Sequence, residues 1–264
     1  MKFLKSIVTI LVAIYIVATG YLYFFQDGMI FPAPGDQIGI EADENFVQIG
    51  VQTPDGEKLF ALHHPSQKNE ATIIVFHGNG DAAIHQKSRG LKLIKAGFGV
   101  LLAEYRGYPG STGTASEVGL FTDALAFYDY IIEQRPQKIG LYGHSLGSGV
   151  STYLASERDV FALVLEGPFD ALAAVAADRY PLIPVWQLIK HKFQSDIYIK
   201  DLDAKILIMH GDLDTTVPIK HGRRLLEAAP KGTNFVEIIG GRHSDLEKFG
   251  SEEKAVDFFK QALN

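Results

Sequence analysis

The 264-residue chain has no cysteine, so disulfide bonds, thiolate metal sites, iron–sulfur clusters and a cysteine nucleophile are excluded. It has no run of five or more lysines and arginines, and its formal net charge is -6, so a surface that binds nucleic acid is not expected. The H-E-x-x-H, G-x-G-x-x-G and G-K-[ST] motifs are missing as well. We therefore expect no metal, nucleotide or flavin cofactor.

Apolar residues make up 47% of the chain and charged residues 21%, which is close to the average for globular proteins. Disorder of the whole chain is thereby excluded. The length of 264 residues fits one large α/β domain or two small ones.

One long uncharged run lies near the N-terminus, from Ser6 to Phe25. Twenty helical residues, at about 1.5 Å each, cover roughly the 30 Å hydrocarbon layer of a bilayer. Lys2 and Lys5 precede the run and Asp27 follows it. The positive-inside rule then predicts a cytoplasmic N-terminus, with the rest of the chain on the non-cytoplasmic side.

We interpret residues 1–27 as a single-pass transmembrane anchor, 28–45 as a linker and 46–264 as the folded domain. A cleaved signal peptide and a buried helix of a soluble protein are the alternatives. The run is longer than the apolar part of most signal peptides, and no clear A-x-A cleavage site follows it. A bacterial inner membrane, with the domain in the periplasm, and a eukaryotic membrane, with the domain in a lumen, both remain open.

Strand and helix patterns alternate through the rest of the chain. The strand-like runs are residues 46–52, 58–63, 72–76, 99–103, 138–142, 161–166, 205–210 and 235–239. The helix-like stretches are residues 82–96, 115–135, 146–156, 219–229 and 251–263. The first two strands are separated by T-P-D-G, which predicts a hairpin. The later strands are continuous apolar runs, which is typical of a parallel sheet covered on both faces. The pattern predicts an α/β fold with a mostly parallel, eight-stranded sheet and helices on both faces.

Residues 170–200 interrupt this alternation. They contain two prolines within Y-P-L-I-P-V-W-Q-L-I-K and the single tryptophan of the chain. Long irregular segments in compact domains often cover active sites. We therefore expect a short lid here, and we call residues 170–200 the lid segment.

The sequence Gly143-His144-Ser145-Leu146-Gly147 follows a predicted strand and precedes a predicted helix. G-x-S-x-G in this context is a turn that lifts the serine hydroxyl above the end of the sheet. The helix that begins after the turn points its N-terminus toward the same place. Ser145 is therefore the candidate nucleophile.

A serine nucleophile needs a base that is oriented by a third group. His243 follows the last predicted strand, and Asp214 follows the strand before it. The chain order Ser, Asp, His is that of α/β hydrolases. Asp170, after an earlier strand, is an alternative to Asp214, and Asp212 is more consistent with a turn contact.

A second donor for an oxyanion is expected in the loop after an earlier strand. His77-Gly78-Asn79-Gly80 stands there. We predict that the backbone N–H groups of Asn79 and Leu146 form the oxyanion hole, and that His77 is a structural residue.

These motifs together resemble the α/β-hydrolase superfamily, and within it the Bem46-like, serine-aminopeptidase-like hydrolases that carry one N-terminal membrane segment. The resemblance covers residues 46–264 and includes Tyr105-Arg106-Gly107-Tyr108 and Gly241-Arg242-His243. It implies that Ser145 is the nucleophile, Asp214 the acid and His243 the base.

We expect a membrane-anchored serine hydrolase that cleaves small-molecule carboxylic esters or thioesters through an acyl-enzyme. Phe169, Tyr180 and Trp186 are the predicted residues of an apolar acyl pocket, with a core role as the alternative. An amide or peptide hydrolase and a catalytically silent binding protein are further alternatives, because a fold does not name its substrate.

Overall fold

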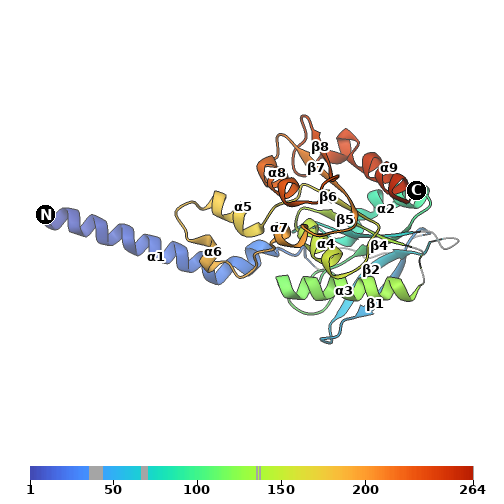
Figure 1. The fold of residues 1–264 in the computed structure, drawn as a ribbon. Coiled ribbons are helices and arrows are strands. Elements are labelled where there is room, and N and C mark those ends of the chain that lie inside the picture. The colour runs from blue at the N-terminus through green and yellow to red at the C-terminus, as the bar shows by residue number, and fades with distance from the viewer. Residues whose placement is uncertain (36–43, 67–70, 135, 137, 264) are drawn as a thin grey trace.

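The computed structural model describes residues 1–35, 44–66, 71–134, 136 and 138–263. Its first element is helix α1 (Lys2–Ile30), which extends away from the rest of the molecule (Figure 1). The helix is long and apolar enough to cross a membrane. Its last three residues fall within the linker that we expected at 28–45, and residues 36–43 of that linker lie outside the described part of the chain.

The described residues form a sheet of eight strands, as predicted. The strands are β1 (Val47–Gln52), β2 (Lys58–His64), β3 (Thr72–Phe76), β4 (Gly99–Ala103), β5 (Ile139–His144), β6 (Ala162–Glu166), β7 (Lys205–Gly211) and β8 (Asn234–Ile238). Their order is β1-β2-β4-β3-β5-β6-β7-β8. Strands β1 and β2 form the predicted antiparallel hairpin, β2 pairs antiparallel with β4, and all later pairs are parallel. The parallel strands therefore point their carboxyl ends to one edge of the sheet.

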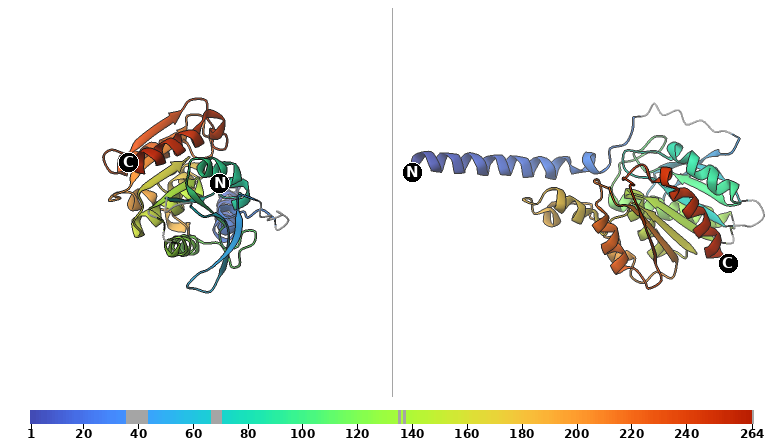
Figure 2. Two further views of the ribbon diagram at one scale, coloured as in Figure 1. Left: turned by 90° about the vertical axis from the view of Figure 1, so that its right-hand side faces the viewer. Right: turned by 90° about the horizontal axis from the view of Figure 1, so that it is seen from above.

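Helices cover both faces of the sheet (Figure 2). They are η1 (Ala83–Gln86), α2 (Lys87–Lys95), α3 (Glu117–Glu133), α4 (Leu146–Glu157), α5 (Leu172–Arg179), α6 (Val185–Leu188), α7 (Ser195–Tyr198), α8 (Ile219–Ala228), η2 (Leu246–Phe249) and α9 (Ser251–Leu263). The helix predicted at 82–96 opens as the 3-10 turn η1 and continues as α2. The lid segment contains α5, α6 and α7.

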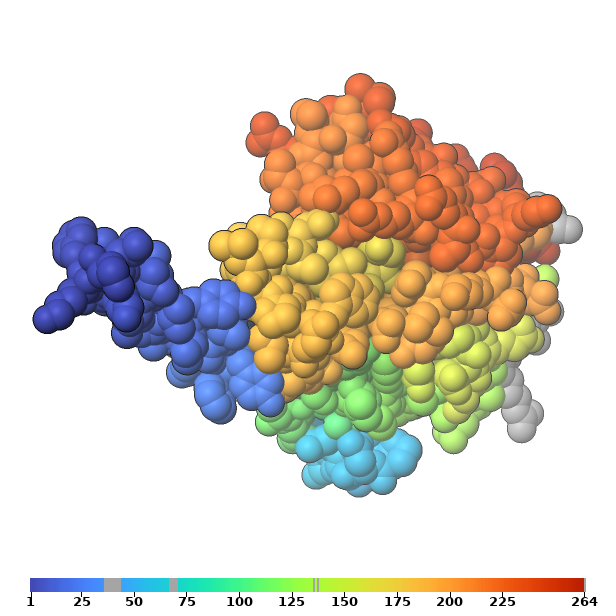
Figure 3. Space-filling view, turned by 60° about the vertical axis from the view of Figure 1, so that its left-hand side comes forward, coloured from blue at the N-terminus to red at the C-terminus, as the bar shows by residue number. Residues whose placement is uncertain are grey.

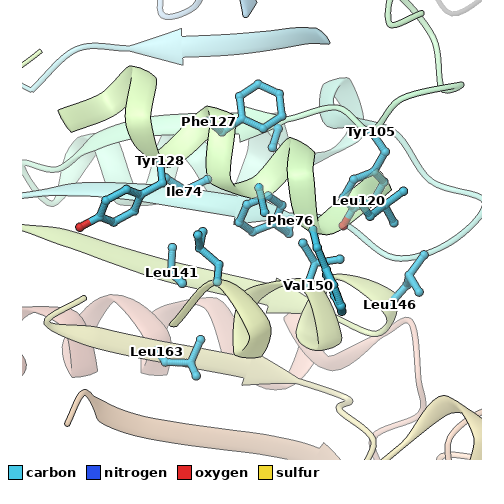
Figure 4. Close-up of a cluster of buried hydrophobic side chains, with 14 of the residues drawn as sticks. Ile74, Phe76, Tyr105, Leu120, Phe127, Tyr128, Leu141, Leu146, Val150 and Leu163 are labelled. Atoms are coloured by element: carbon cyan, nitrogen blue, oxygen red, sulfur yellow. The ribbon is translucent and has the colours of Figure 1, made fainter. Parts of the chain in front are cut away.

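Alternation along each strand divides the core into two apolar layers. Ile73 and Val75 of β3 face the layer under α2 and α9, and Ile74 and Phe76 face the layer under α3 and α4. Figure 4 shows the second layer, where side chains of α3 and α4 pack against strands β3, β5 and β6. Both faces of the central strands are therefore dry, which explains their uninterrupted apolar sequences.

His63 of β2 makes the stability of this fold depend on pH. Its side chain is buried beside the ring of Tyr130, and burial lowers its pKa from 6.5 to about 4. Between these two values the unfolded chain binds more protons than the folded chain, so stability is lost as the pH falls from 6.5 to 4.

We therefore expect His63→Gln to reduce the loss of unfolding free energy between pH 7.5 and pH 5 by about 1–2 kcal/mol. Urea unfolding of both proteins at the two pH values measures this difference. An equal loss of stability in the two proteins would contradict the assignment.

Candidate functional site

Ser145 lies in a sharp turn between β5 and α4. Its φ is 51°, an uncommon value for a residue with a side chain. The backbone N–H of Ser145 donates to the carbonyl of Glu166 at 2.9 Å, which ties the turn to the end of β6. Residues held in such sparsely populated conformations cluster at active sites.

Two glycines of the turn have no room for a side chain. A Cβ at Gly143 would lie 2.4 Å from the carbonyl oxygen of Gly147. A Cβ at Gly147 would lie 2.2 Å from the carbonyl oxygen of Phe76, at the end of β3. Both contacts are to backbone atoms that cannot move aside cheaply. The spacing of the G-x-S-x-G motif therefore follows from how closely α4 approaches the sheet.

The structure brings Ser145, His243 and Asp214 together. The Nε2 atom of His243 lies 2.8 Å from Oγ of Ser145, and its Nδ1 atom lies 2.6 Å from Oδ2 of Asp214. An ionised carboxylate can only accept, so Nδ1–H donates to Asp214. The unprotonated Nε2 is then free to accept the hydroxyl proton of Ser145.

The surroundings of Asp214 keep it ionised. Burial would raise the pKa of this carboxyl, but hydrogen bonds from His210, His243 and the N–H of Val217 hold the pKa well below its usual range. The backbone N–H groups of Thr216 and Val217 donate to Oδ1 at 2.9 and 2.8 Å. Oδ2 faces Nδ1 of His243 at 2.6 Å, and Nε2 of His210 lies 3.4 Å from the same oxygen, so the carboxylate has a fixed orientation.

The two competing acids lie elsewhere. Oδ1 of Asp170 lies 2.6 Å from Nδ1 of His221, a ring on α8. Oδ1 of Asp212 accepts the N–H of Gly240 at 2.7 Å, which is the turn contact that we expected. In this structure only Asp214, of the three carboxylates considered, is hydrogen-bonded to His243.

His144 is a neighbour of His243 whose role the sequence did not reveal. Burial lowers the pKa of His144 to about 4, so its ring is neutral at pH 7. Its Nε2–H can donate to the backbone carbonyl of His243 at 3.2 Å, and the two ring centres lie 5.3 Å apart. A neutral ring here contacts the backbone of His243 and places no positive charge beside it.

The loop of the predicted oxyanion hole runs directly beside Ser145. A Cβ at Gly78 would lie 3.2 Å from Cβ of Ser145. The next residue, Asn79, is exposed, and its Nδ2 donates to the carbonyl of Ile30 at 3.5 Å. Leu146 is the first residue of α4, so its N–H belongs to the unpaired first turn of that helix.

His77 braces this loop from below, in the structural role that we predicted for it. It is fully buried, with Nε2 2.8 Å from Oε1 of Glu104 and Nδ1 2.7 Å from the carbonyl of Gly78. Burial alone would lower the pKa of His77, but Glu104 raises it above the ordinary value. Within the described ranges, no group of three or more potential metal ligands occurs.

A cavity of about 600 Å³ opens beside Ser145 and His243. Its lining is polar and includes Arg89 and Glu166, which pair at 3.1 Å although both are buried. Arg89 also lies over the ring of Tyr142. Sequence reasoning missed this pair, since Arg89 and Glu166 lie 77 positions apart and belong to no spacing motif.

The structure does not gather the three residues predicted for an acyl pocket. Phe169 is buried in the core against Gly149 of α4. Trp186 is 41% exposed on the lid segment. Tyr180 lines a second, apolar cavity of about 110 Å³ between α1 and the lid segment, and neither Phe169 nor Trp186 is part of its lining.

Comparison with known proteins identifies the family of this chain. Residues 67–204, more than half of the chain, match the family described as serine aminopeptidase, S33. The chain belongs to this family. Among its relatives, an uncharacterized protein of Mycobacterium tuberculosis strain H37Rv is 33% identical over 231 residues, which are 86% of this chain and 80% of the relative.

A second relative has a named activity. The lysophosphatidylserine lipase ABHD12 of Danio rerio is 30% identical over 225 residues, covering 73% of this chain. The match covers only 57% of that lipase. The esterase Pf2001 of Pyrococcus furiosus has the same fold as this S33 member, with a TM-score of 0.72 at 18% identity over 87% of this chain and 98% of the esterase. These relatives support an α/β hydrolase.

Proposed function

We propose that this protein is a membrane-anchored serine hydrolase that cleaves carboxylic esters or thioesters of small molecules. The observation that carries the proposal is the hydrogen-bonded chain from Ser145 Oγ through His243 to Asp214, with distances of 2.8 and 2.6 Å. These lengths are within the range that proton transfer between a nucleophile and its base requires.

In the proposed reaction, Ser145 Oγ attacks the acyl carbonyl carbon while Nε2 of His243 takes the hydroxyl proton. The tetrahedral intermediate collapses, the bond to the leaving oxygen or sulfur breaks, and His243 gives its proton to the leaving group. Water then attacks the acyl-enzyme, with His243 again accepting a proton, and the carboxylic acid is released. Asp214 stabilises the imidazolium of His243 in both acylation and deacylation.

The backbone N–H groups of Leu146 and Asn79 are the proposed oxyanion donors. Leu146 N–H belongs to the unpaired first turn of α4, so it costs no reorganisation when negative charge develops on the substrate. Asn79 lies in the loop that packs beside Ser145 and lines the same cavity. His77 and Glu104 act through this loop as positioning residues.

Ester substrates are favoured by the similar proteins, which include a lipase and an esterase. Thioesters belong to the proposal because they present the same acyl carbonyl to Ser145. The family description, serine aminopeptidase, makes amide hydrolysis the second candidate. The polar cavity beside Ser145 suits a hydrophilic leaving group, since Arg89, Glu166 and His144 line it.

The membrane assignment is supported by α1, whose 29 residues have a mean hydropathy of 2.2 in their most apolar window. The helix has Lys2 and Lys5 at its start and Asp27 near its end. By the positive-inside rule its N-terminus is cytoplasmic and the hydrolase domain lies on the other side.

The test is hydrolysis of p-nitrophenyl esters of increasing acyl length by the full-length protein in detergent, with the matching thioesters and p-nitroanilides in parallel. We expect turnover of esters and thioesters and much slower turnover of anilides. Preferential cleavage of anilides would support the amide alternative. No turnover of any of them would favour a silent binding protein.

A further inference from the structure

The lid segment lies beside α1 (Figures 1 and 3) and makes specific contacts with it. The hydroxyl of Tyr15 donates to the carbonyl of Leu182 at 3.0 Å. Gln26 makes two hydrogen bonds to the lid segment: its Nε2 donates to the carbonyl of Leu188 at 3.2 Å, and its Oε1 accepts from the N–H of Lys190 at 2.7 Å. The Nζ of Lys190 lies 3.1 Å from Asp27. These contacts hold the lid segment against α1 from Tyr15 to Asp27.

The contact of Tyr15 lies in the middle of the apolar run. From Tyr15 to Phe25 the helix rises about 15 Å, which is half of the hydrocarbon thickness. If α1 crosses a bilayer, the tip of the lid at Leu182 lies inside it. The side chain of Leu182 is 82% exposed in the structure. Such exposure of an apolar side chain is unfavourable in water and favourable in a bilayer.

The composition of the lid tip suits such a position. Residues 180–189 read Y-P-L-I-P-V-W-Q-L-I and contain no charge, whereas Arg179 and Lys190 stand on either side. Long basic side chains at the ends of an apolar segment can reach the headgroup region.

The lid backbone is largely provided with hydrogen-bond partners, as a lipid environment demands. Pro181 and Pro184 have no N–H to satisfy. Five other backbone N–H groups of the tip donate to carbonyls of residues 176–185, namely those of Tyr180, Ile183, Val185, Gln187 and Ile189. The carbonyls of Leu182 and Leu188 accept from α1 side chains.

Helix and lid enclose the apolar cavity of about 110 Å³ between them. Leu22 and Ile30 line it from α1, and Ala176 and Leu188 line it from the lid. The carbonyl of Ile30 also accepts a hydrogen bond from Nδ2 of Asn79, a residue that lines the polar cavity beside Ser145. This contact joins the wall of the apolar cavity to the wall of the polar cavity that Ser145 lines.

We propose that the lid tip, residues 180–189, is embedded in the bilayer beside α1, and that the cavity between them receives part of an acyl chain of a membrane lipid. The acyl chain enters sideways from the bilayer, and its ester group reaches Ser145 past the contact of Ile30 with Asn79. This inference rests on the proposed ester hydrolysis and adds that the substrate is a membrane lipid and that the anchor helix forms part of its binding site.

Trp186, the single tryptophan, reports the position of the lid directly. The full-length protein is placed in phosphatidylcholine vesicles whose acyl chains are brominated. We expect the bromine atoms to quench Trp186 fluorescence, and aqueous iodide to have little effect. Quenching by iodide alone would overturn the embedded lid, because it would show that Trp186 faces water. The measurement needs no turnover and so is independent of the proposed hydrolysis.

Ala176→Trp tests the acyl chain site, with Ala177→Trp as the matched control on the same helix. Ala176 lines the cavity and Ala177 does not. In vesicles, we expect Ala176→Trp to lower hydrolysis of p-nitrophenyl palmitate at least about tenfold and to leave p-nitrophenyl butyrate hydrolysis unchanged. Ala177→Trp should keep both activities. Equal loss of both esters in Ala176→Trp, or full palmitate activity, would overturn the acyl chain site.

Leu22→Trp repeats the test from α1, where a folding defect of the hydrolase domain is avoided. Leu22 lines the cavity, whereas Phe24 is 72% exposed and lines none of the cavities described here, so Phe24→Trp is the control. We expect loss of palmitate turnover only in Leu22→Trp. If the unmodified protein hydrolyses neither ester, the proposed function itself is contradicted and the acyl chain site with it.

Discussion

Replacing Ser145 with alanine is expected to lower kcat for ester hydrolysis by about 10⁴- to 10⁶-fold, because no other group can form the acyl-enzyme. The hydroxyl lies 2.8 Å from Nε2 of His243, and its removal leaves the base with no proton to take. Steady-state and burst kinetics with a p-nitrophenyl ester measure the loss. The burst of p-nitrophenol should disappear together with turnover.

Ser156→Ala is the matched control. Ser156 is an exposed residue near the end of the same helix, α4, and its hydroxyl bonds only to the local carbonyl of Tyr153 at 2.7 Å among the contacts described. We expect it to retain full activity. Substantial ester turnover by Ser145→Ala would contradict the assignment of the nucleophile.

Asp214→Asn is expected to lower kcat by about 10⁴-fold, the effect known for the corresponding change in chymotrypsin-type enzymes. An amide at this position can donate to Nδ1 of His243, and this favours the tautomer whose proton is on Nε2. That tautomer cannot accept the proton of Ser145. KM should change far less than kcat, since Asp214 does not touch the substrate.

Asp212→Asn and Asp170→Asn are the controls, because these carboxylates bond to Gly240 and His221 and not to His243. Both variants should keep kcat within an order of magnitude. Kinetics of all three variants at pH 8 would decide between the acids. A large loss in Asp170→Asn with an active Asp214→Asn would reverse the assignment.

The sheet could be predicted from the sequence because buried strands have a simple requirement. Strands such as β3 need apolar side chains on both faces, and the run Ile73 to Phe76 meets that need without interruption. The G-x-S-x-G turn could also be predicted from the sequence, because its geometry has an equally simple requirement. Only glycine fits where a Cβ would meet the carbonyl oxygen of Phe76 or Gly147.

The order of nucleophile, acid and base was also accessible, since the carboxyl ends of parallel strands meet at one edge. Phe169 shows where this reasoning fails. It follows a strand and is apolar, as a pocket residue would be, but it is buried against α4. Composition alone does not say whether an apolar residue at a strand end faces the core or a ligand.

The contacts between α1 and the lid segment were not predictable. Gln26 and Lys190 are 164 positions apart, and no periodicity links them. Arg89 and Glu166 are likewise far apart in the sequence, and their pairing belongs to no motif. Such contacts depend on how irregular segments meet after the sheet has formed, and only the folded structure shows them.

The central claim is that Ser145 is an activated nucleophile. Incubation of the full-length protein with a fluorophosphonate, followed by peptide mass spectrometry, tests this claim without knowledge of the natural substrate. We predict one adduct per chain on Ser145, strongly reduced in Asp214→Asn and absent in Ser145→Ala. An unlabelled protein, or an adduct on another residue that persists in Ser145→Ala, would contradict it.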